Sequence, residues 1–203
     1  MISIKIGGSL LDNNKLSYFL KLVVQQKKKC VLIPGGGVFA DTVRQQQQKL
    51  KFDDLTAHNL SVLSMLKVGH ILKSKISKYC EIIENISQLS HSKKCNVFIW
   101  NPEQEIYNEK NIHTNWEMTS DTIALKVSKK INSNVLIIVK SCEIPSDKTN
   151  LHPLALNKKK VRELSKIKIL DKAFPSAYVE CQFPVYVISI NQSEFLKKIL
   201  SNF

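Results

Sequence analysis

The stretch Ile4–Leu11 reads IKIGGSLL, which places a lysine inside an apolar strand and two glycines directly after it. Lysine resists burial, and each glycine adds backbone entropy that is lost on folding. Two glycines at this point therefore indicate that another group comes very close to the backbone. Backbone N–H groups that converge between a strand and a helix bind anions, and Lys5 would add a positive charge to such a site.

A second glycine cluster, GGGVFA at Gly35–Ala40, also follows a predicted strand and begins a predicted helix. Two such loops in one small sheet favour a phosphate site over two ordinary tight turns. The same letters match the Gly-x-Gly-x-x-Gly/Ala dinucleotide fingerprint, with Asp53 or Asp54 near the spacing of the ribose-binding acid. The preceding proline and the position of both acids between two helices count against a nicotinamide-dependent enzyme, which stays as an alternative.

The order of the predicted elements indicates an α/β protein. Apolar runs predict strands at 2–6, 30–34, 80–84, 95–102, 134–141 and 183–190. Helical spacing predicts helices at 10–29, 38–51, 53–76, 120–132 and 191–203, and it places the glutamine run at 45–48 on an exposed helix. Because strands alternate with helices, we expect a mainly parallel sheet with helices on both faces. No linker divides the chain, so 1–203 is expected to form one domain.

The composition narrows the classes of protein that fit. The chain has 43% hydrophobic residues, which is enough for a core, and no apolar run long enough to span a membrane. Its N-terminus reads as a strand rather than a signal peptide. The five scattered cysteines predict reduced thiols in the cytoplasm, and neither cysteine nor histidine shows metal-ligand spacing. The net charge is +13, but only Arg44 and Arg162 are arginines, so we expect no nucleic-acid partner.

Two further charged residues stand at element boundaries. Lys140 ends the apolar run NVLIIVKS, and Asp121 opens the helix predicted from NWEMTSDTIAL. Taken alone, Lys140 is equally well explained by a strand end that reaches water, and Asp121 is better explained by a helix cap. With Lys5 nearby, a buried carboxylate that anchors two lysines becomes the more attractive hypothesis.

The segments KIGGSLL, IPGGGVFADTVR, NWEMTSDTIAL and VLIIVKS resemble, in this order, the amino acid kinase family with its carbamate kinase-like fold. The resemblance implies a three-layer αβα sandwich with a sheet of about eight strands, and a kinase that uses ATP and Mg²⁺. It implies that 1–114 binds the acceptor and 115–203 the nucleotide. The GGGxxAD loop and the W-x-x-TSD box are most similar to the branch that phosphorylates an aminomethylfuran-methyl phosphate during methanofuran-type cofactor synthesis.

The resemblance also assigns roles to residues. The catalytic residues would be Lys5, Asp121 and Lys140. The ATP and its phosphates would be bound by Gly7, Gly8, Ser9, Ser120, Ser141, Asp147 and Asp171. The acceptor would be bound by Gly36, Gly37, Asp41, Arg44 and His58. Magnesium would bind through the phosphates of ATP, without metal ligands from the chain.

The acceptor assignment also has a basis in residue spacing. Asp41 and Arg44 are three residues apart and share one helical face, where they would take the amine and the phosphate of the acceptor. The alternative is a surface ion pair. His58 is equally well explained as a packed helix histidine.

The chain departs from the family at two places. Larger members carry TDVDG where this chain has VKSCEIPSD, and many carry a late Gly-Met-x-x-Lys segment where this chain has DKAFPSAY. Lys140 would then replace the missing late lysine, with Lys126 and Lys172 as the other candidates.

The expected function is transfer of the γ-phosphate of ATP to a small phosphorylated amine. The alternatives are a carboxylate or nucleoside monophosphate kinase, a nicotinamide-dependent enzyme, and a non-catalytic protein that binds nucleotide or nucleic acid. We expect a cytoplasmic homo-oligomer whose partners are ATP and a small-molecule substrate, without a membrane partner.

Overall fold

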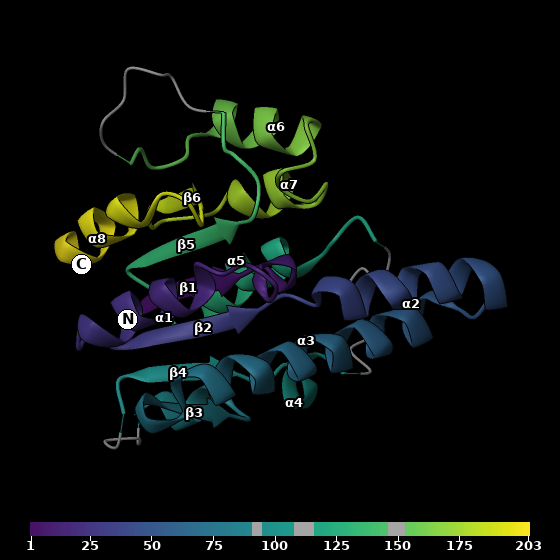
Figure 1. The fold of residues 1–203 in the computed structure, drawn as a ribbon. Helices are drawn as coiled ribbons and strands as arrows, with labels where there is room; N and C mark the ends of the chain where they lie inside the picture. The colour runs from purple at the N-terminus through teal and green to yellow at the C-terminus, as the bar shows by residue number, and fades with distance from the viewer. Residues whose placement is uncertain (91–94, 108–115, 146–152) are drawn as a thin grey trace.

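The structure is a computed structural model that describes residues 1–90, 95–107, 116–145 and 153–203, and its centre is one parallel sheet (Figure 1). The strands are β1 (Ile2–Ile6), β2 (Cys30–Pro34), β3 (Cys80–Ile83), β4 (Val97–Trp100), β5 (Val135–Lys140) and β6 (Val185–Ser189). Their order is β3-β4-β2-β1-β5-β6, and every neighbouring pair is parallel. The α/β class and the parallel sheet are confirmed, but the described residues form six strands rather than about eight. These six are the strands that the apolar runs predict.

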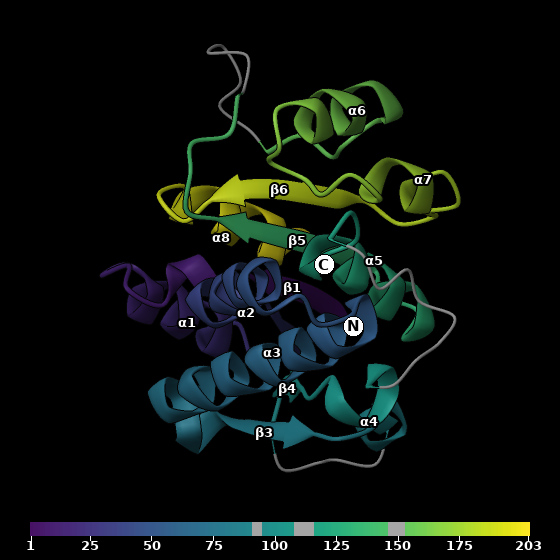
Figure 2. The same cartoon turned by 90° about the vertical axis from the view of Figure 1, so that its right-hand side faces the viewer.

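Helices cover both sides of the sheet (Figures 1 and 2). The α-helices are α1 (Leu16–Gln25), α2 (Gly37–Leu50), α3 (Asp54–Ile76), α4 (Glu103–Ile106), α5 (Ser120–Lys130), α6 (Lys158–Lys166), α7 (Phe174–Tyr178) and α8 (Ser193–Asn202). Short 3₁₀ helices are η1 (Gly8–Leu10), η2 (Ser77–Tyr79) and η3 (Ile86–Ser90). The helix predicted at 10–29 is shorter than expected because turns occupy the polar residues before Leu16. None of the described helices combines the length and the apolar character that a membrane span needs.

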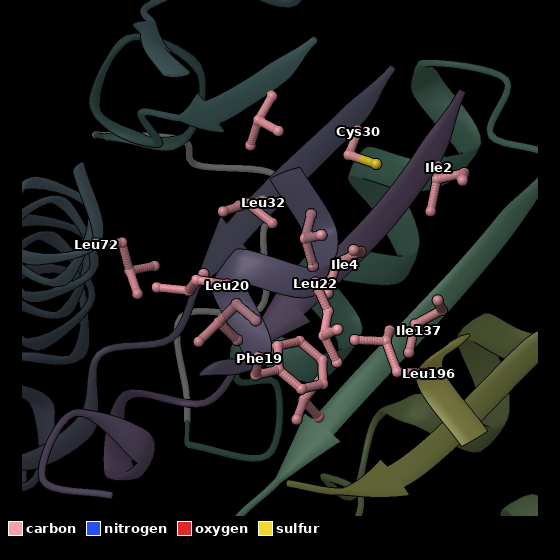
Figure 3. Packing of buried hydrophobic residues seen from close by; sticks show 14 of the residues in the cluster. Ile2, Ile4, Phe19, Leu20, Leu22, Cys30, Leu32, Leu72, Ile137 and Leu196 are labelled. Atoms are coloured by element: carbon pink, nitrogen blue, oxygen red, sulfur yellow. The ribbon is translucent and has the colours of Figure 1, made fainter. Parts of the chain in front are cut away.

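The core has two parts, one on each face of the sheet. Alternate residues of β1 point to opposite faces, so Ile2, Ile4 and Ile6 pack with α1, α8 and the second half of α3 (Figure 3). The opposite face packs Ile33 and Ile138 against α5, α6 and α7. Lys5 belongs to this second face by the same alternation. A charged residue is therefore built into the side of the sheet that α5 covers.

The α2–α3 hairpin projects beyond the carboxyl ends of the strands (Figure 1). Lys51 ends α2 in the left-handed conformation, with φ 56°, and Asp53 caps α3 by accepting a hydrogen bond from Thr56 N at 2.7 Å. In parallel α/β sheets, ligands bind beyond the carboxyl ends of the strands. The loops that follow β1, β2 and β5 all open at this edge, because the three strands are neighbours.

Candidate active site

The two glycine loops contact each other directly. A Cβ added to Gly8 would lie 2.2 Å from the backbone nitrogen of Gly37, and a Cβ on Gly37 would lie 2.5 Å from the carbonyl carbon of Gly8. Gly37 also has φ +54°, which side chains other than glycine rarely adopt. The glycines of both clusters predicted that another group comes close to the backbone. In part, that group is the backbone of the other glycine loop. It brings the loop after β1 against the N-terminus of α2.

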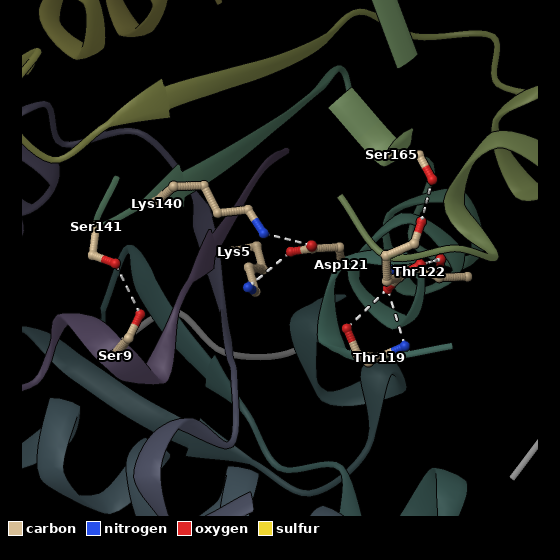
Figure 4. Close-up of polar contacts among 9 residues, drawn as sticks. Lys5, Ser9, Thr119, Asp121, Thr122, Lys140, Ser141 and Ser165 are labelled. Carbon is tan, nitrogen blue, oxygen red and sulfur yellow. Dashed lines mark hydrogen bonds and ion pairs between the residues drawn. The ribbon is translucent and has the colours of Figure 1, made fainter. Parts of the chain in front are cut away.

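Asp121 contacts both of the lysines that the sequence singles out (Figure 4). Lys5 Nζ forms an ion pair with Oδ1 at 2.8 Å, and Lys140 Nζ donates a hydrogen bond to Oδ2 at 2.5 Å. The Lys5 contact has the distance of an ion pair but not the angles of a hydrogen bond. The three side chains are 5%, 4% and 16% exposed for Lys5, Asp121 and Lys140. Two ammonium groups and one carboxylate leave one net positive charge at this buried point.

The ion pairs change the protonation of the cluster. Burial acts to raise the pKa of Asp121, but the ammonium groups of Lys5 and Lys140 together outweigh burial, so the pKa falls below its ordinary value. Burial lowers the pKa of Lys140, repulsion by Lys5 lowers it further, and attraction by Asp121 only partly opposes both. Asp121 is thus held as a carboxylate with both oxygens committed to lysines, a state suited to orienting them rather than to accepting a proton.

A cavity of about 260 Å³ opens between the glycine loops, the α2–α3 hairpin and the start of α5. The predicted site residues that line it are Lys5, Gly7, Gly8, Ser9, Gly36, Gly37, Asp41, Arg44, His58, Ser120 and Lys140. Ser141 does not line it but lies beside it, with its hydroxyl 3.2 Å from that of Ser9. Asp147 lies outside the described residues. The sequence thus brings together, at one cavity, residues from five separate segments.

Asp171 lies behind this cavity instead of lining it. One carboxylate oxygen accepts hydrogen bonds from the backbone nitrogens of Thr119 and Thr122, each at 3.0 Å, and the other accepts the Thr122 hydroxyl. Burial raises the pKa of Asp171, although the Thr122 hydrogen bonds act against the rise. Its oxygens therefore hold the first turn of α5, the helix that carries Asp121. The resemblance had assigned Asp171 to direct binding of ATP.

The predicted acceptor residues are placed as follows. Asp41 and Arg44 both lie at the cavity. They form no ion pair with each other, although a surface ion pair was the alternative explanation of their spacing. The Arg44 guanidinium carbon lies 4.4 Å from the centre of the Trp116 ring. His58 lines the cavity and is also packed, since its Nε2 donates to the carbonyl oxygen of Ile106 at 2.7 Å.

The remaining lysine candidates lie elsewhere. Lys172 is exposed and pairs with Glu117. Lys126 is an exposed residue of α5. Neither of them lines the cavity. Lys140 is thus the lysine that shares Asp121 with Lys5.

Sequence reasoning missed the apolar wall of the cavity. This wall is formed by Ala40, Ala57, Val62, Met65, Trp116, Met118 and Ile123. Trp116 is the first residue of the W-x-x-TSD box that contains Asp121. Its place in this box was the only feature of the sequence that pointed to a role at the site. Met118 lies just before α5, and the others read as ordinary core positions of their helices, because an apolar residue that lines a cavity has the same helical spacing as one that fills a core.

Comparison with known proteins agrees with this geometry. No protein-family model matches the chain. The chain is 26% identical over 200 residues to the [5-(aminomethyl)furan-3-yl]methyl phosphate kinase of Methanocaldococcus jannaschii, covering 97% of this chain and 91% of that protein. Among solved structures it is similar to uridylate kinase from Archaeoglobus fulgidus, with a TM-score of 0.73 and 18% identity over 98% of this chain and 95% of that one. The fold is that of the amino acid kinases.

Aspartate kinase from Synechocystis shares this amino acid kinase fold, with a TM-score of 0.71 and 14% identity over 96% of this chain and 38% of that longer one. The curated relative and the solved structures are all kinases by name. Together they support a phosphotransferase, and they favour phosphoryl transfer over the nicotinamide alternative. The nicotinamide alternative required Asp53 or Asp54 to bind a ribose. Instead, Asp53 caps α3 and Asp54 accepts a hydrogen bond from Gln47, so both acids stabilise the α2–α3 hairpin.

Proposed function

We propose that the protein is an ATP-dependent kinase that transfers the γ-phosphoryl group to a small phosphorylated amine. The observation that supports this most directly is Asp121, buried between Lys5 and Lys140 at the edge where two glycine loops meet. Phosphoryl transfer depends on positioning and on neutralising charge rather than on a covalent intermediate. A pair of oriented ammonium groups supplies that neutralisation for the oxygens of the moving group.

The site suits an acceptor that is already an anion. A phosphate monoester is largely doubly ionised near neutral pH, since its second pKa is about 6. Its oxygen can attack without a general base. Asp121 could not act as one, because both its oxygens contact lysines. A carboxylate acceptor would meet the same requirement, whereas a hydroxyl acceptor would need a base.

The proposed step is a single displacement. An oxygen of the acceptor phosphate forms a bond to the γ-phosphorus of ATP, and the bond from that phosphorus to the β–γ bridging oxygen breaks. ADP takes the electron pair and leaves, and the acceptor becomes a diphosphate. Lys5 and Lys140 face the charge on the transferring oxygens, and backbone N–H groups of the loop at Gly7–Ser9 are available to the same oxygens.

Magnesium fits this site as part of the nucleotide. No group of three His, Cys, Asp or Glu side chains among the described residues could hold a metal ion. As the resemblance implies, Mg²⁺ would bind through the phosphates of ATP, where it would neutralise charge alongside the two lysines. The residues of this chain would orient the phosphates to which the ion is bound.

The nucleotide and the acceptor are assigned to different sides of the lysine pair. A second cavity of about 210 Å³ is lined by the loop after β5 and by α6, β6 and α8. Its largely apolar walls, which include Leu156, Tyr186 and Phe195, suit a flat base. We place the adenine there, and the acceptor between the glycine loops and the α2–α3 hairpin. This division follows the expected acceptor half at 1–114 and nucleotide half at 115–203, except that Trp116 and the start of α5 also line the acceptor cavity.

The relative's name gives the proposed acceptor, [5-(aminomethyl)furan-3-yl]methyl phosphate. In this assignment Asp41 takes the ammonium group and Arg44 the phosphate. The cavity of about 260 Å³ is below the roughly 300–1,000 Å³ typical of drug-sized ligands, which favours a small acceptor. The second candidate is a nucleoside monophosphate kinase, which the likeness to uridylate kinase favours.

One acceptor panel separates these candidates. ADP formation is measured with the aminomethylfuran phosphate, with its analogue that lacks the amine, with UMP and with aspartate. The proposal expects the aminomethylfuran phosphate to give the highest kcat/KM by at least tenfold. A higher kcat/KM for UMP would replace it with the second candidate.

A further inference from the structure

The glutamine run at 45–48 contains one residue that differs from its neighbours. Gln45, Gln46 and Gln48 are exposed, and the structure gives their side chains no hydrogen bond to a described residue, whereas Gln47 is half-buried. The Gln47 amide oxygen accepts a hydrogen bond from the indole nitrogen of Trp116 at 2.6 Å. The contact joins α2 to the segment that leads into α5. A stretch of low complexity thus includes one specific contact.

The orientation of the Gln47 amide is fixed by its partners. The indole N–H of Trp116 can only donate, so the group it meets must be the amide oxygen. The amide nitrogen donates on the other side to Asp54 Oδ1 at 2.8 Å. Gln47 therefore links the start of α3 to Trp116, and it holds the plane of the indole ring relative to the α2–α3 hairpin.

The guanidinium group of Arg44 lies over the ring of Trp116. The guanidinium carbon is 4.4 Å from the ring centre, within the range of a cation–π contact. No carboxylate of the described residues pairs with Arg44. A cation–π contact leaves the guanidinium N–H donors that point away from the ring free to bind a phosphate in two places. Both Arg44 and Trp116 line the cavity.

We propose that Trp116 is a positioning residue that sets the plane of the Arg44 guanidinium for the phosphate of the acceptor, and that Gln47 fixes Trp116 for this task. The inference rests on the proposed function for the identity of the acceptor, but it concerns anion binding and not the transfer step. An exposed arginine samples many rotamers, and holding it in one before binding lowers the entropy lost when the anion arrives. Arg44, Trp116 and Gln47 would thus act as one unit.

The first test uses steady-state kinetics with a double-mutant cycle. Trp116→Leu is expected to raise the KM for the acceptor about five- to tenfold, with the KM for ATP within twofold of wild type. Trp116→Phe keeps a ring below the guanidinium and should recover most of this loss. In an Arg44→Gln background, Trp116→Leu should add less than twofold, because Trp116 acts through Arg44. Full additivity of the two changes would overturn the positioning role.

The second test measures binding without catalysis. Inorganic phosphate is titrated into the protein without ATP, and the emission of Trp116 is followed, with Trp100 as a buried and constant background. The half-saturating phosphate concentration should rise about fivefold in Gln47→Met and more in Arg44→Gln. Gln46→Met is the matched control and should stay within twofold of wild type. Equal affinities in Gln47→Met and Gln46→Met would overturn the role of Gln47.

The two proposals fail in different ways. If phosphate binding depends on Gln47 and Arg44 but the aminomethylfuran phosphate is not phosphorylated, the proposed acceptor is wrong and this inference stands. If the acceptor is phosphorylated and these variants leave its KM and the phosphate affinity unchanged, the inference is wrong and the proposed function stands. Circular dichroism at matched temperature confirms that each variant is folded before either comparison.

Discussion

At the scale of single residues, the state of Lys140 decides how the site responds to pH. Its ammonium group is buried beside Lys5, and burial and this repulsion lower the pKa of Lys140 below the ordinary 10.5. The proposed reaction needs the charged form. As pH rises through the lowered pKa the ammonium is lost, so kcat is expected to fall at a pH below 10.5.

Lys140→Arg tests this assignment, because a guanidinium stays charged at every accessible pH. The alkaline fall of kcat should move to higher pH in this variant. Lys126→Arg, on the exposed side of α5, is the control and should keep the wild-type profile. An unchanged alkaline limb in Lys140→Arg would show that another group sets it.

Asp41 carries the prediction for the amine of the acceptor. Its carboxylate lies at the cavity mouth without a lysine or arginine partner among the described residues. Asp41→Asn should raise the KM for the aminomethylfuran phosphate about tenfold, a loss in the range of a charged hydrogen bond. The KM for the analogue without the amine should change less than twofold. Equal effects on the two acceptors would remove Asp41 from amine binding.

At the scale of elements, the contact between the two glycine loops separates structural from functional glycines. Gly8→Ala would place a Cβ 2.2 Å from Gly37 N, so it should lower the free energy of unfolding by about 1–3 kcal/mol. Gly7 has φ −60°, and a Cβ there would lie 3.4 Å from its nearest neighbour, the Val139 carbonyl oxygen. Gly7→Ala should therefore fold normally.

The same Gly7→Ala methyl would lie 3.8 Å from Lys5 Nζ, where the transferring phosphoryl group is expected. Its kcat should fall about tenfold or more, while its urea midpoint stays at the wild-type value. The two variants are compared by urea unfolding and by turnover. A stable, fully active Gly7→Ala would show that the loop after β1 does not approach the phosphate.

The N-terminus of α5 depends on Asp171 in a way that activity should report. Asp171→Ala removes the acceptor for the backbone nitrogens of Thr119 and Thr122, and losing such a cap costs about 1 kcal/mol. Because Asp121 is in the first turn of α5, kcat should fall with it. Asp171→Asn keeps an oxygen acceptor and should recover part of kcat. If Asp171 instead binds ATP directly, the alanine change will raise the KM for ATP with little effect on stability.

At the scale of the whole molecule, much of the fold could be predicted because its strands are continuous apolar runs between glycine, proline and polar segments. The Lys5–Asp121–Lys140 cluster could be predicted as well, because Lys5 interrupts an apolar strand and Asp121 and Lys140 stand at the boundaries of their elements. For the part of the chain that the structure describes, the number of strands was overestimated, since the resemblance suggested about eight and the apolar runs supply six.

Other features of the site could not be predicted from local patterns. The Gln47–Trp116 hydrogen bond joins residues 69 positions apart, and the hydrogen bond from Thr119 N to Asp171 spans 52. Neither pair has a spacing that helix or strand periodicity specifies. The same holds for the backbone contact between Gly8 and Gly37, which depends on how two neighbouring strands end.

The central claim is that the Lys5–Asp121–Lys140 cluster transfers a phosphoryl group to an acceptor phosphate. The most direct measurement is ³¹P NMR of the protein with ATP, Mg²⁺ and [5-(aminomethyl)furan-3-yl]methyl phosphate. We expect two coupled diphosphate resonances to appear with ADP in equal amount, with the rate reduced at least a hundredfold in Lys140→Met. Lys172→Met, an exposed control, should match wild type. Release of inorganic phosphate without a diphosphate, or full transfer by Lys140→Met, would contradict the claim.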